Sequence, residues 1–81
     1  MRYQLRFEKL AFKDLQKLEK SDRQRVVASI EKMTTDLFGD VKKLTAHDPR
    51  YRLRVGSFRD LFNIERDEIL VHRIRDRRDA Y

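Results

Sequence analysis

Arginine is concentrated in the second half of this 81-residue chain, and its guanidinium group is well suited to hold a phosphate. All nine lysine and arginine residues from position 50 onward are arginines, whereas the seven lysines lie before residue 44. A guanidinium stays charged and donates two parallel hydrogen bonds to an anion, while lysine is a strongly hydrated point charge. Two interpretations follow: an anion-binding face in the C-terminal half, or an ordinary solvated basic face.

The spacing of these arginines places several of them on one face of a predicted sheet. Residues 50–55 alternate basic and apolar side chains, and Gly56 and Ser57 suit a two-residue turn in which glycine supplies a positive φ. Such a turn sets Arg54 opposite Arg59, where like charges repel unless an anion lies between them. Neighbouring residues complete the predicted anion-binding face: Arg50, Arg52 and His72, with the apolar Leu61, Leu70 and Ile74 beside them.

Three other titratable side chains have a structural as well as a chemical interpretation. Asp60 falls on the buried face opposite Arg73, which predicts a cross-strand ion pair between them. Histidine is the side chain that titrates near neutral pH, so His72 is either a passive strand residue or a group that exchanges protons with a substrate. His47 lies in a predicted loop, where we assign it no function.

Two amphipathic helices must support this sheet. Apolar residues recur at helical spacing over residues 9–19 and again from residue 21 to Gly39, a residue type that often ends a helix. Ser21 and Gln24 form a plausible capping box at the start of the second helix. The predicted core stripes of the two helices are Ala11, Leu15 and Leu18, then Val26, Ile30, Met33 and Leu37.

The whole pattern predicts one α+β domain over residues 1–81, in the order β-α-α-β-β-β. We expect an antiparallel sheet with a two-helix hairpin packed on one face and a short C-terminal tail or helix. Residues 40–49 read as a connection. The predicted strands cover residues 2–7, 50–55, 58–65 and 68–74, and a basic tail covers residues 75–81.

Composition restricts the partners and the chemistry. The net charge of +6 predicts attraction to a polyanion, either RNA, DNA or an acidic protein segment. The absence of cysteine excludes disulfides and thiolate metal sites, and the two histidines match no zinc motif, so we expect no metal and no cofactor. No apolar run exceeds three residues, so we expect no membrane span and no signal peptide, hence a cytoplasmic protein.

Two C-terminal segments resemble the RelE/ParE superfamily of toxins from toxin–antitoxin pairs. Residues 51–59 (YRLRVGSFR) are similar to the family's Tyr-Arg-Leu-Arg-x-Gly-x-Tyr-Arg hairpin, and residues 71–81 (VHRIRDRRDAY) to its closing His-Arg-x-x-x-Tyr motif. Residues 13–18 (KDLQKL) and 41–44 (VKKL) resemble the family's first helix and its lead into the sheet. The resemblance covers essentially the whole chain, and the hairpin and tail together are its specific part.

The resemblance implies a ribosome-dependent endoribonuclease that a cognate antitoxin silences. The expected step is attack of a ribose 2′-OH on the adjacent phosphate of mRNA in the ribosomal A site, which blocks translation. It implies catalytic roles for Arg54, Arg59, Arg77 and Tyr81, with the two arginines Arg59 and Arg77 stabilising charge. Tyr81 then stacks on a base or transfers a proton; otherwise it is a packed terminal aromatic. The RNA-binding residues implied are Arg50, Arg52, Arg54, Arg59, His72 and Arg78.

The sequence departs from the family pattern at Asp76, where many members have histidine. Because arginine is a poor proton acceptor, the general base stays open among His72, Tyr81, Asp76 and the terminal carboxylate. The alternative function is that of a ParE-like toxin, which inhibits DNA gyrase without cutting RNA. Under either reading we expect an acidic, partly disordered antitoxin segment to cover the arginine face and its apolar neighbours.

Overall fold

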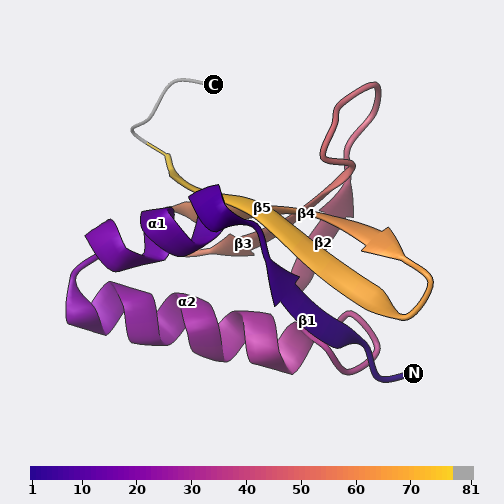
Figure 1. Ribbon diagram of the computed structural model, residues 1–81, viewed down its shortest axis with the longest axis horizontal. Helices are drawn as coiled ribbons and strands as arrows, with labels where there is room; N and C mark the ends of the chain where they lie inside the picture. The colour runs from indigo at the N-terminus through magenta and orange to yellow at the C-terminus, as the bar shows by residue number, and fades with distance from the viewer. Residues whose placement is uncertain (78–81) are drawn as a thin grey trace.

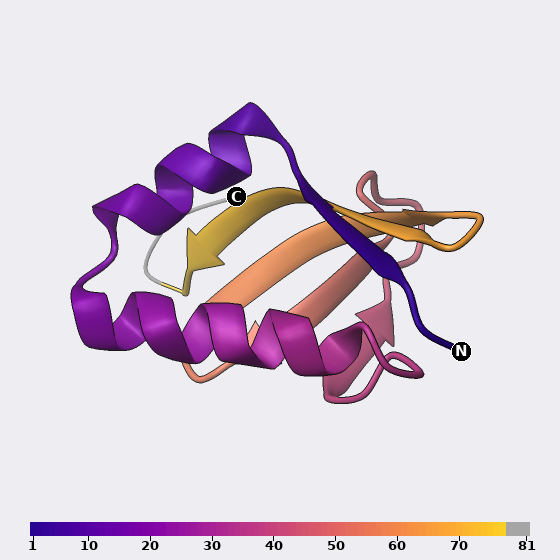
Figure 2. The same ribbon diagram turned by 60° about the horizontal axis from the view of Figure 1, so that its bottom comes forward.

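Two helices cover one face of a five-stranded sheet in the computed structural model, which describes residues 1–77 (Figure 1). Figure 2 shows that the helices diverge from a short link while both stay on the same side of the sheet. This architecture confirms the predicted α+β fold. The elements are β1 (Gln4–Phe7), α1 (Lys9–Lys17), α2 (Lys20–Met33), β2 (Asp40–Lys43), β3 (Tyr51–Val55), β4 (Phe58–Glu65) and β5 (Glu68–Asp76).

The strand order in the sheet is β1-β5-β4-β3-β2. Strands β2 to β5 are antiparallel neighbours, whereas β1 pairs with β5 in parallel, so the sheet is mixed rather than wholly antiparallel. The two helices connect β1 with β2 at the opposite edge of the sheet. The last strand, β5, then pairs with the first strand, β1. The sheet therefore joins the two ends of the described chain.

Apolar side chains from the helices and from one face of the sheet form the core. Each fully buried aliphatic or aromatic side chain contributes about 1.5–3 kcal/mol to folding. Most of the predicted stripes are confirmed, with Leu18 and Leu37 packed at the margin of the core rather than inside it. The core comprises Ala11, Leu15, Val26, Ile30, Met33, Leu53, Val55, Phe58, Phe62, Ile69, Val71 and Ile74.

The ends of α2 differ from the prediction. The helix begins at Lys20, and its N-cap Glu19 makes no side-chain capping bond, so the predicted capping box is wrong. The helix ends at Met33 rather than near Gly39, because the backbone after Met33 is hydrogen-bonded to the N-terminal segment. The N–H of Tyr3 donates to Thr34 O at 2.7 Å. Asp36 and Leu37, which follow the end of the helix, have positive φ angles of 55° and 56°, which are not helical.

The predicted connection over residues 40–49 contains a strand. Strand β2 pairs with β3, with Val41 opposite Leu53, and the Leu44 N–H donates to Arg50 O at 2.6 Å where the two strands separate. The prediction missed β2 because four mostly exposed residues with one apolar side chain carry almost no periodic signal. Pairing with the edge of β3 makes this segment a strand.

A bulge in β5 shifts the pairing of β4 with β5. The turn register is as predicted at Ile64 and Ile69, but the register changes between Leu61 and Phe62, so Leu61 lies opposite Arg73 rather than His72. An extra residue in one strand turns every later side chain to the other face. As a result Ile74 lies in the core rather than on the arginine face, and β5 continues through Asp76, which was predicted to be tail.

The predicted ion pair between Asp60 and Arg73 is wrong for the same reason. Asp60 lies opposite Ile74, and Arg73 instead binds the α1 carboxylate of Asp14, with Nε 2.8 Å from Oδ2. The same oxygen accepts the Ile74 N–H at 2.9 Å. Burial alone raises the pKa of Asp14, but these hydrogen bonds and the positive charge of Arg73 outweigh it and hold the pKa below its usual value. Asp14 thus ties α1 to the last strand.

Asp60 is left as a fully buried carboxyl group on the helix side of the sheet. Neither of its oxygens has a hydrogen-bond partner among residues 1–77. Burial raises the pKa of Asp60 from 3.8 to about 8, because the ionised form loses its hydration. The folded protein therefore holds this carboxyl protonated at neutral pH.

Candidate phosphate-binding groove

Three arginines form a row across the middle strands of the sheet. Arg54 in β3 lies opposite Arg59 in β4, as predicted, and Arg59 lies opposite Arg75 in β5. Directly opposed residues in neighbouring strands have Cβ atoms about 4.5–5.5 Å apart, so the Cβ atoms of the three arginines span about 10 Å. Such a cluster suits a polyanion, since a bound phosphate would offset the repulsion between them.

A groove of about 280 Å³ runs beside this row on the face away from the helices. Leu61 provides an apolar floor and is only 8% exposed, although it lies outside the core between the helices and the sheet. Long basic side chains line the groove beside it. The residues that line the groove are Lys42, Leu44, His47, Arg52, Arg54, Arg59 and Leu61.

Arg52 is partly committed to holding the edge strand. Its Nη1 donates to Asp40 O at 3.0 Å and lies 3.4 Å from Asp40 Oδ1, and its side chain is mostly buried. Arg54 is exposed, and it lies between Asp40 of β2 and Arg59 of β4 in the sheet register. Arg59 is half-buried in the row. Arg54 and Arg59 are thus placed to meet a ligand, while Arg52 adds charge from a fixed position.

The loop between β2 and β3 brings His47 to the groove. Its Nδ1 lies 2.9 Å from Pro49 O, and a carbonyl oxygen can only accept, so Nδ1 donates. Ala46 before it has a positive φ of 52°. His47 also lines an adjoining pocket of about 440 Å³ with Ala46, Asp48 and Arg50.

The structure brings together some of the predicted site residues and separates others. Arg52, Arg54 and Arg59 share the groove, and Arg50 is exposed in the adjoining pocket. The backbone N–H of Arg77 donates to Ser57 O at 2.7 Å, which places this exposed residue beside the turn between β3 and β4. The remaining predicted residues of the tail, Arg78 and Tyr81, lie outside the described residues.

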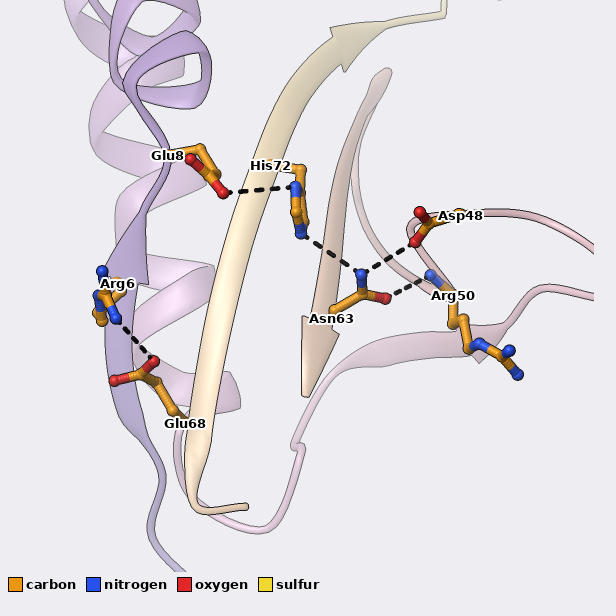
Figure 3. A network of polar contacts seen from close by, with 7 residues as sticks. All are labelled: Arg6, Glu8, Asp48, Arg50, Asn63, Glu68 and His72. Atoms are coloured by element: carbon orange, nitrogen blue, oxygen red, sulfur yellow. Dashed lines mark hydrogen bonds and ion pairs between the residues drawn. The ribbon is translucent and has the colours of Figure 1, made fainter. Parts of the chain in front are cut away.

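His72 does not line the groove and belongs to a polar network that holds the neighbouring loop (Figure 3). Asn63 Nδ2 donates to His72 Nε2 at 3.4 Å, and His72 Nδ1 lies 3.8 Å from Glu8 Oε1. Asn63 also accepts the Arg50 N–H at 2.7 Å and donates to Asp48 at 3.1 Å, so it anchors the β2–β3 loop to the sheet. The side chain of Arg50 points away from this network in Figure 3. His72 therefore supports the loop that carries His47.

Sequence reasoning missed three members of the site. Arg75 joins the arginine row only because of the bulge, which has no signal in the alternation of residues 68–76. Lys42 reaches the groove because β2 is a strand with Lys42 opposite Arg52. His47 comes from an irregular loop, whose path periodicity cannot predict.

Neither a metal cluster nor a membrane-spanning helix is found in the described part of the chain. Residues 1–77 contain no group of three or more histidine, aspartate or glutamate side chains placed to hold a metal ion. Within the same residues, neither helix is long and apolar enough to cross a membrane. The groups that the groove offers to a ligand are its cations, an imidazole and two leucines.

Known proteins similar to this chain are toxins. A family described as ParE toxin of type II toxin–antitoxin system, parDE, matches residues 5–81. Toxin RelE3 from Methanocaldococcus jannaschii is 31% identical, and the match covers 93% of this chain and 91% of the relative. The putative toxin RelE1 of the same organism is 30% identical, with 100% of this chain and 97% of the relative covered.

Solved structures share the fold. A RelB-RelE antitoxin–toxin complex from Methanococcus jannaschii contains a chain with a TM-score of 0.74 and 29% identity, with 89% of each chain covered. The toxin–antitoxin complex RelBE2 from Mycobacterium tuberculosis has a TM-score of 0.81 at 22% identity, covering 94% of this chain and 99% of that one. The resemblance seen in residues 51–59 and 71–81 is confirmed, and the chain belongs to the RelE/ParE superfamily of toxins of type II toxin–antitoxin systems.

Proposed function

We propose that this toxin is an endoribonuclease that cleaves mRNA on the ribosome and is neutralised by a cognate antitoxin. The row formed by Arg54, Arg59 and Arg75, with the groove beside it, is the observation that carries this proposal. The names of the two relatives that are at least 30% identical, both RelE toxins, support the same branch.

The proposed reaction is attack of a ribose 2′-oxygen on the adjacent phosphorus, with release of the 5′-oxygen of the next nucleotide. Negative charge accumulates on the phosphorane, and preorganised cations stabilise it more than they stabilise the substrate. Arg54 and Arg59 are the groove residues that would bind this phosphate, and Arg77 would approach it from the end of the β3–β4 turn. Tyr81 keeps its proposed role of stacking on a base.

The rest of the basic surface would hold the RNA strand. Arg50 is exposed beside the groove and Arg52 lines it, so both would contact neighbouring phosphates, together with Arg78 from the tail. Contacts of this kind bind without reading sequence and weaken as salt rises. We leave His72 out of the RNA-binding set, because it does not line the groove and its ring nitrogens face Asn63 and Glu8.

A cognate antitoxin is the second partner we propose. The Methanococcus jannaschii relative of 29% identity was solved as a RelB-RelE complex, which supports this partner. An acidic segment would complement the arginine row, while apolar side chains anchor it. Of the three apolar anchors expected from the sequence, Ile74 is in the core, Leu61 is buried and Leu70 is half-buried. Leu10 and Phe12 on α1 are more exposed and would offer a larger apolar contact to the antitoxin.

Gyrase inhibition is the second candidate function. The description of the matching family as ParE toxin favours it, and a ParDE system from Pseudomonas aeruginosa shares the fold with a TM-score of 0.74 at 14% identity. A toxin of this kind does not cut RNA, so it needs no groove for a scissile phosphate. The two functions therefore differ in what the loss of a groove arginine does to RNA.

Primer extension on mRNA after brief induction separates these functions. Wild-type protein should produce new 5′ ends inside coding regions, and Arg59→Ala should remove them. Arg66→Ala is the matched control, since it removes the same charge from the exposed turn between β4 and β5, outside the groove. Intact mRNA together with growth arrest and DNA damage would reject the nuclease and support the gyrase inhibitor.

A further inference from the structure

The groove contains one side chain that can accept a proton near neutral pH. Arginine and lysine are cationic in that range, and leucine does not titrate, which leaves His47 among the groove-lining residues. The bond from Nδ1 to Pro49 O fixes the proton of a neutral imidazole on Nδ1. The lone pair then lies on Nε2, the nitrogen at the far side of the ring, as a general base requires.

Three other titratable groups in the described chain are less well placed for this role. His72 Nε2 accepts from Asn63 Nδ2, so its lone pair is occupied. Asp60 is fully buried on the helix side of the sheet. Asp76 lies opposite Phe58, a core residue, and opposed residues share a face, so Asp76 is on the side away from the arginine row.

We propose that Nε2 of His47 is the general base of the cleavage step, an inference that rests on the proposed nuclease function. Nε2 takes the proton from the ribose 2′-OH, and the 2′-oxygen forms a bond to phosphorus. The bond from phosphorus to the 5′-oxygen breaks, and the leaving oxygen takes a proton from water. The products are a 2′,3′-cyclic phosphate and a 5′-hydroxyl, and the imidazolium returns its proton to solvent.

The network around Asn63 gives His47 its position. Asn63 accepts the backbone N–H of Arg50 and donates to Asp48, one residue on from His47, so the loop is fastened to β4 on the side of the groove. A base held in this way does not have to be ordered when substrate binds, which is an advantage for proton transfer. The bond to Pro49 O fixes the ring within the loop in the same manner.

The charged groups that face His47 have side chains whose types do not ordinarily titrate between pH 5 and pH 8. A rise of the cleavage rate with pH over that range therefore reports on an imidazole, since ionisation of the buried Asp60 would destabilise the fold and lower the rate instead. These groups are Lys42, Arg52, Arg54 and Arg59 in the groove, and Asp48 and Arg50 in the adjoining pocket.

Single-turnover cleavage of mRNA on programmed ribosomes by the purified toxin, measured from pH 5.5 to pH 8, tests the proposal. His47→Asn is the informative variant, because its amide N–H can still reach Pro49 O while the base is absent. The wild-type rate should rise with pH and level off, and the variant should lose that rise and fall on the order of 100-fold. The concentration of toxin that half-saturates the ribosomes should stay the same, since binding depends on the arginines.

Two further variants keep the result interpretable. His47→Ala should regain activity when imidazole is added to the buffer, and rescue of this kind does not occur when a substitution only disturbs the fold. His72→Gln should keep the pH dependence; if it removes that dependence while His47→Asn keeps it, the base is His72 and the proposal is overturned.

The outcomes separate this inference from the proposed function. Cleavage by the wild type with an unchanged rate for His47→Asn would overturn the role of His47 and leave the nuclease intact. Absence of cleavage by the wild type under the same conditions would reject both.

Discussion

Replacing Asp60 by asparagine should stabilise the fold at neutral pH and remove most of its pH dependence between pH 4 and pH 8. Asp60 is fully buried, and burial raises the pKa of its carboxyl to about 8. In the unfolded chain the same group ionises at its ordinary value of 3.8. Between these two values the folded state keeps a proton that the unfolded state has released, so a rise in pH favours unfolding.

The size of the effect follows from this difference. Each pH unit between the two values lowers the free energy of unfolding by about 1.4 kcal/mol, so by pH 7 the loss reaches about 4 kcal/mol. A domain of this size has a total stability of only about 5–15 kcal/mol. The asparagine side chain resembles the protonated carboxyl in shape and does not titrate. Asp60→Asn should therefore equal the wild type near pH 4 and exceed it by about 4 kcal/mol at pH 7.

Urea unfolding followed by circular dichroism at several pH values between 4 and 8 measures this difference. Asp67→Asn is the matched control, because it removes an exposed carboxyl in the turn between β4 and β5 and should leave the slope unchanged. Parallel curves for the wild type and Asp60→Asn would show that the buried carboxyl is not protonated in the folded state, and the reasoning about its burial would fail.

Three further predictions concern function, the α1 anchor and the hairpin turn. Arg77→Ala should abolish toxicity on induction while antitoxin binding, measured by calorimetry, largely survives; loss of both would show that one surface serves both purposes. Asp14→Ala should lower the free energy of unfolding by about 2–3 kcal/mol at pH 7, because it removes the acceptor for Arg73 and the Ile74 N–H. Since the folded pKa of Asp14 is lowered, this loss should shrink as pH falls below about 4, and a loss that grows there would contradict the assignment. Gly56→Ala should cost about 1 kcal/mol in thermal unfolding, because φ is 58° and the new Cβ would lie 3.0 Å from the flexible end of Arg25; an unchanged melting temperature would contradict this.

Local patterns were sufficient to predict the hairpin that carries the site. The alternation of residues 50–55 and the turn at Gly56 place Arg54 opposite Arg59, as the structure has them. Both signals act within a few residues, and turn geometry alone fixes the register of a hairpin. The same reasoning holds at the turn between β4 and β5, where Ile64 lies opposite Ile69.

The parts of the site that were not predicted depend on long-range contacts. The bulge that brings Arg75 opposite Arg59 also buries Ile74 against the helices, so the packing of the core favours the bulge. Strand β2, which carries Lys42, exists because β3 offers a free edge to it. The position of His47 depends on the bond between Asn63 and Asp48, two residues that no pattern in the sequence connects.

The packing of the core allows the sheet to hold the arginine row that the proposed function needs. Positive charges at Arg54 and Arg59 repel across one strand pair, and the hydrophobic packing of the opposite face of β3 and β4 offsets that repulsion. A bound polyanion would convert the repulsion into attraction. Both partners that we propose for this face, RNA and an acidic antitoxin segment, have the charge that it needs.

Removal of a single 2′-hydroxyl from the mRNA tests whether this toxin cleaves RNA by attack of that hydroxyl on the adjacent phosphate. Purified toxin is incubated with ribosomes programmed with an mRNA that contains one mapped cleavage site, and with a second mRNA that has 2′-deoxyribose at the nucleotide before that site. The proposed mechanism predicts cleavage of the first mRNA, with a 2′,3′-cyclic phosphate on the upstream fragment, and none at the modified site of the second. Equal cleavage of both messages would contradict the 2′-hydroxyl mechanism, and with it the chemistry assigned to the arginine row.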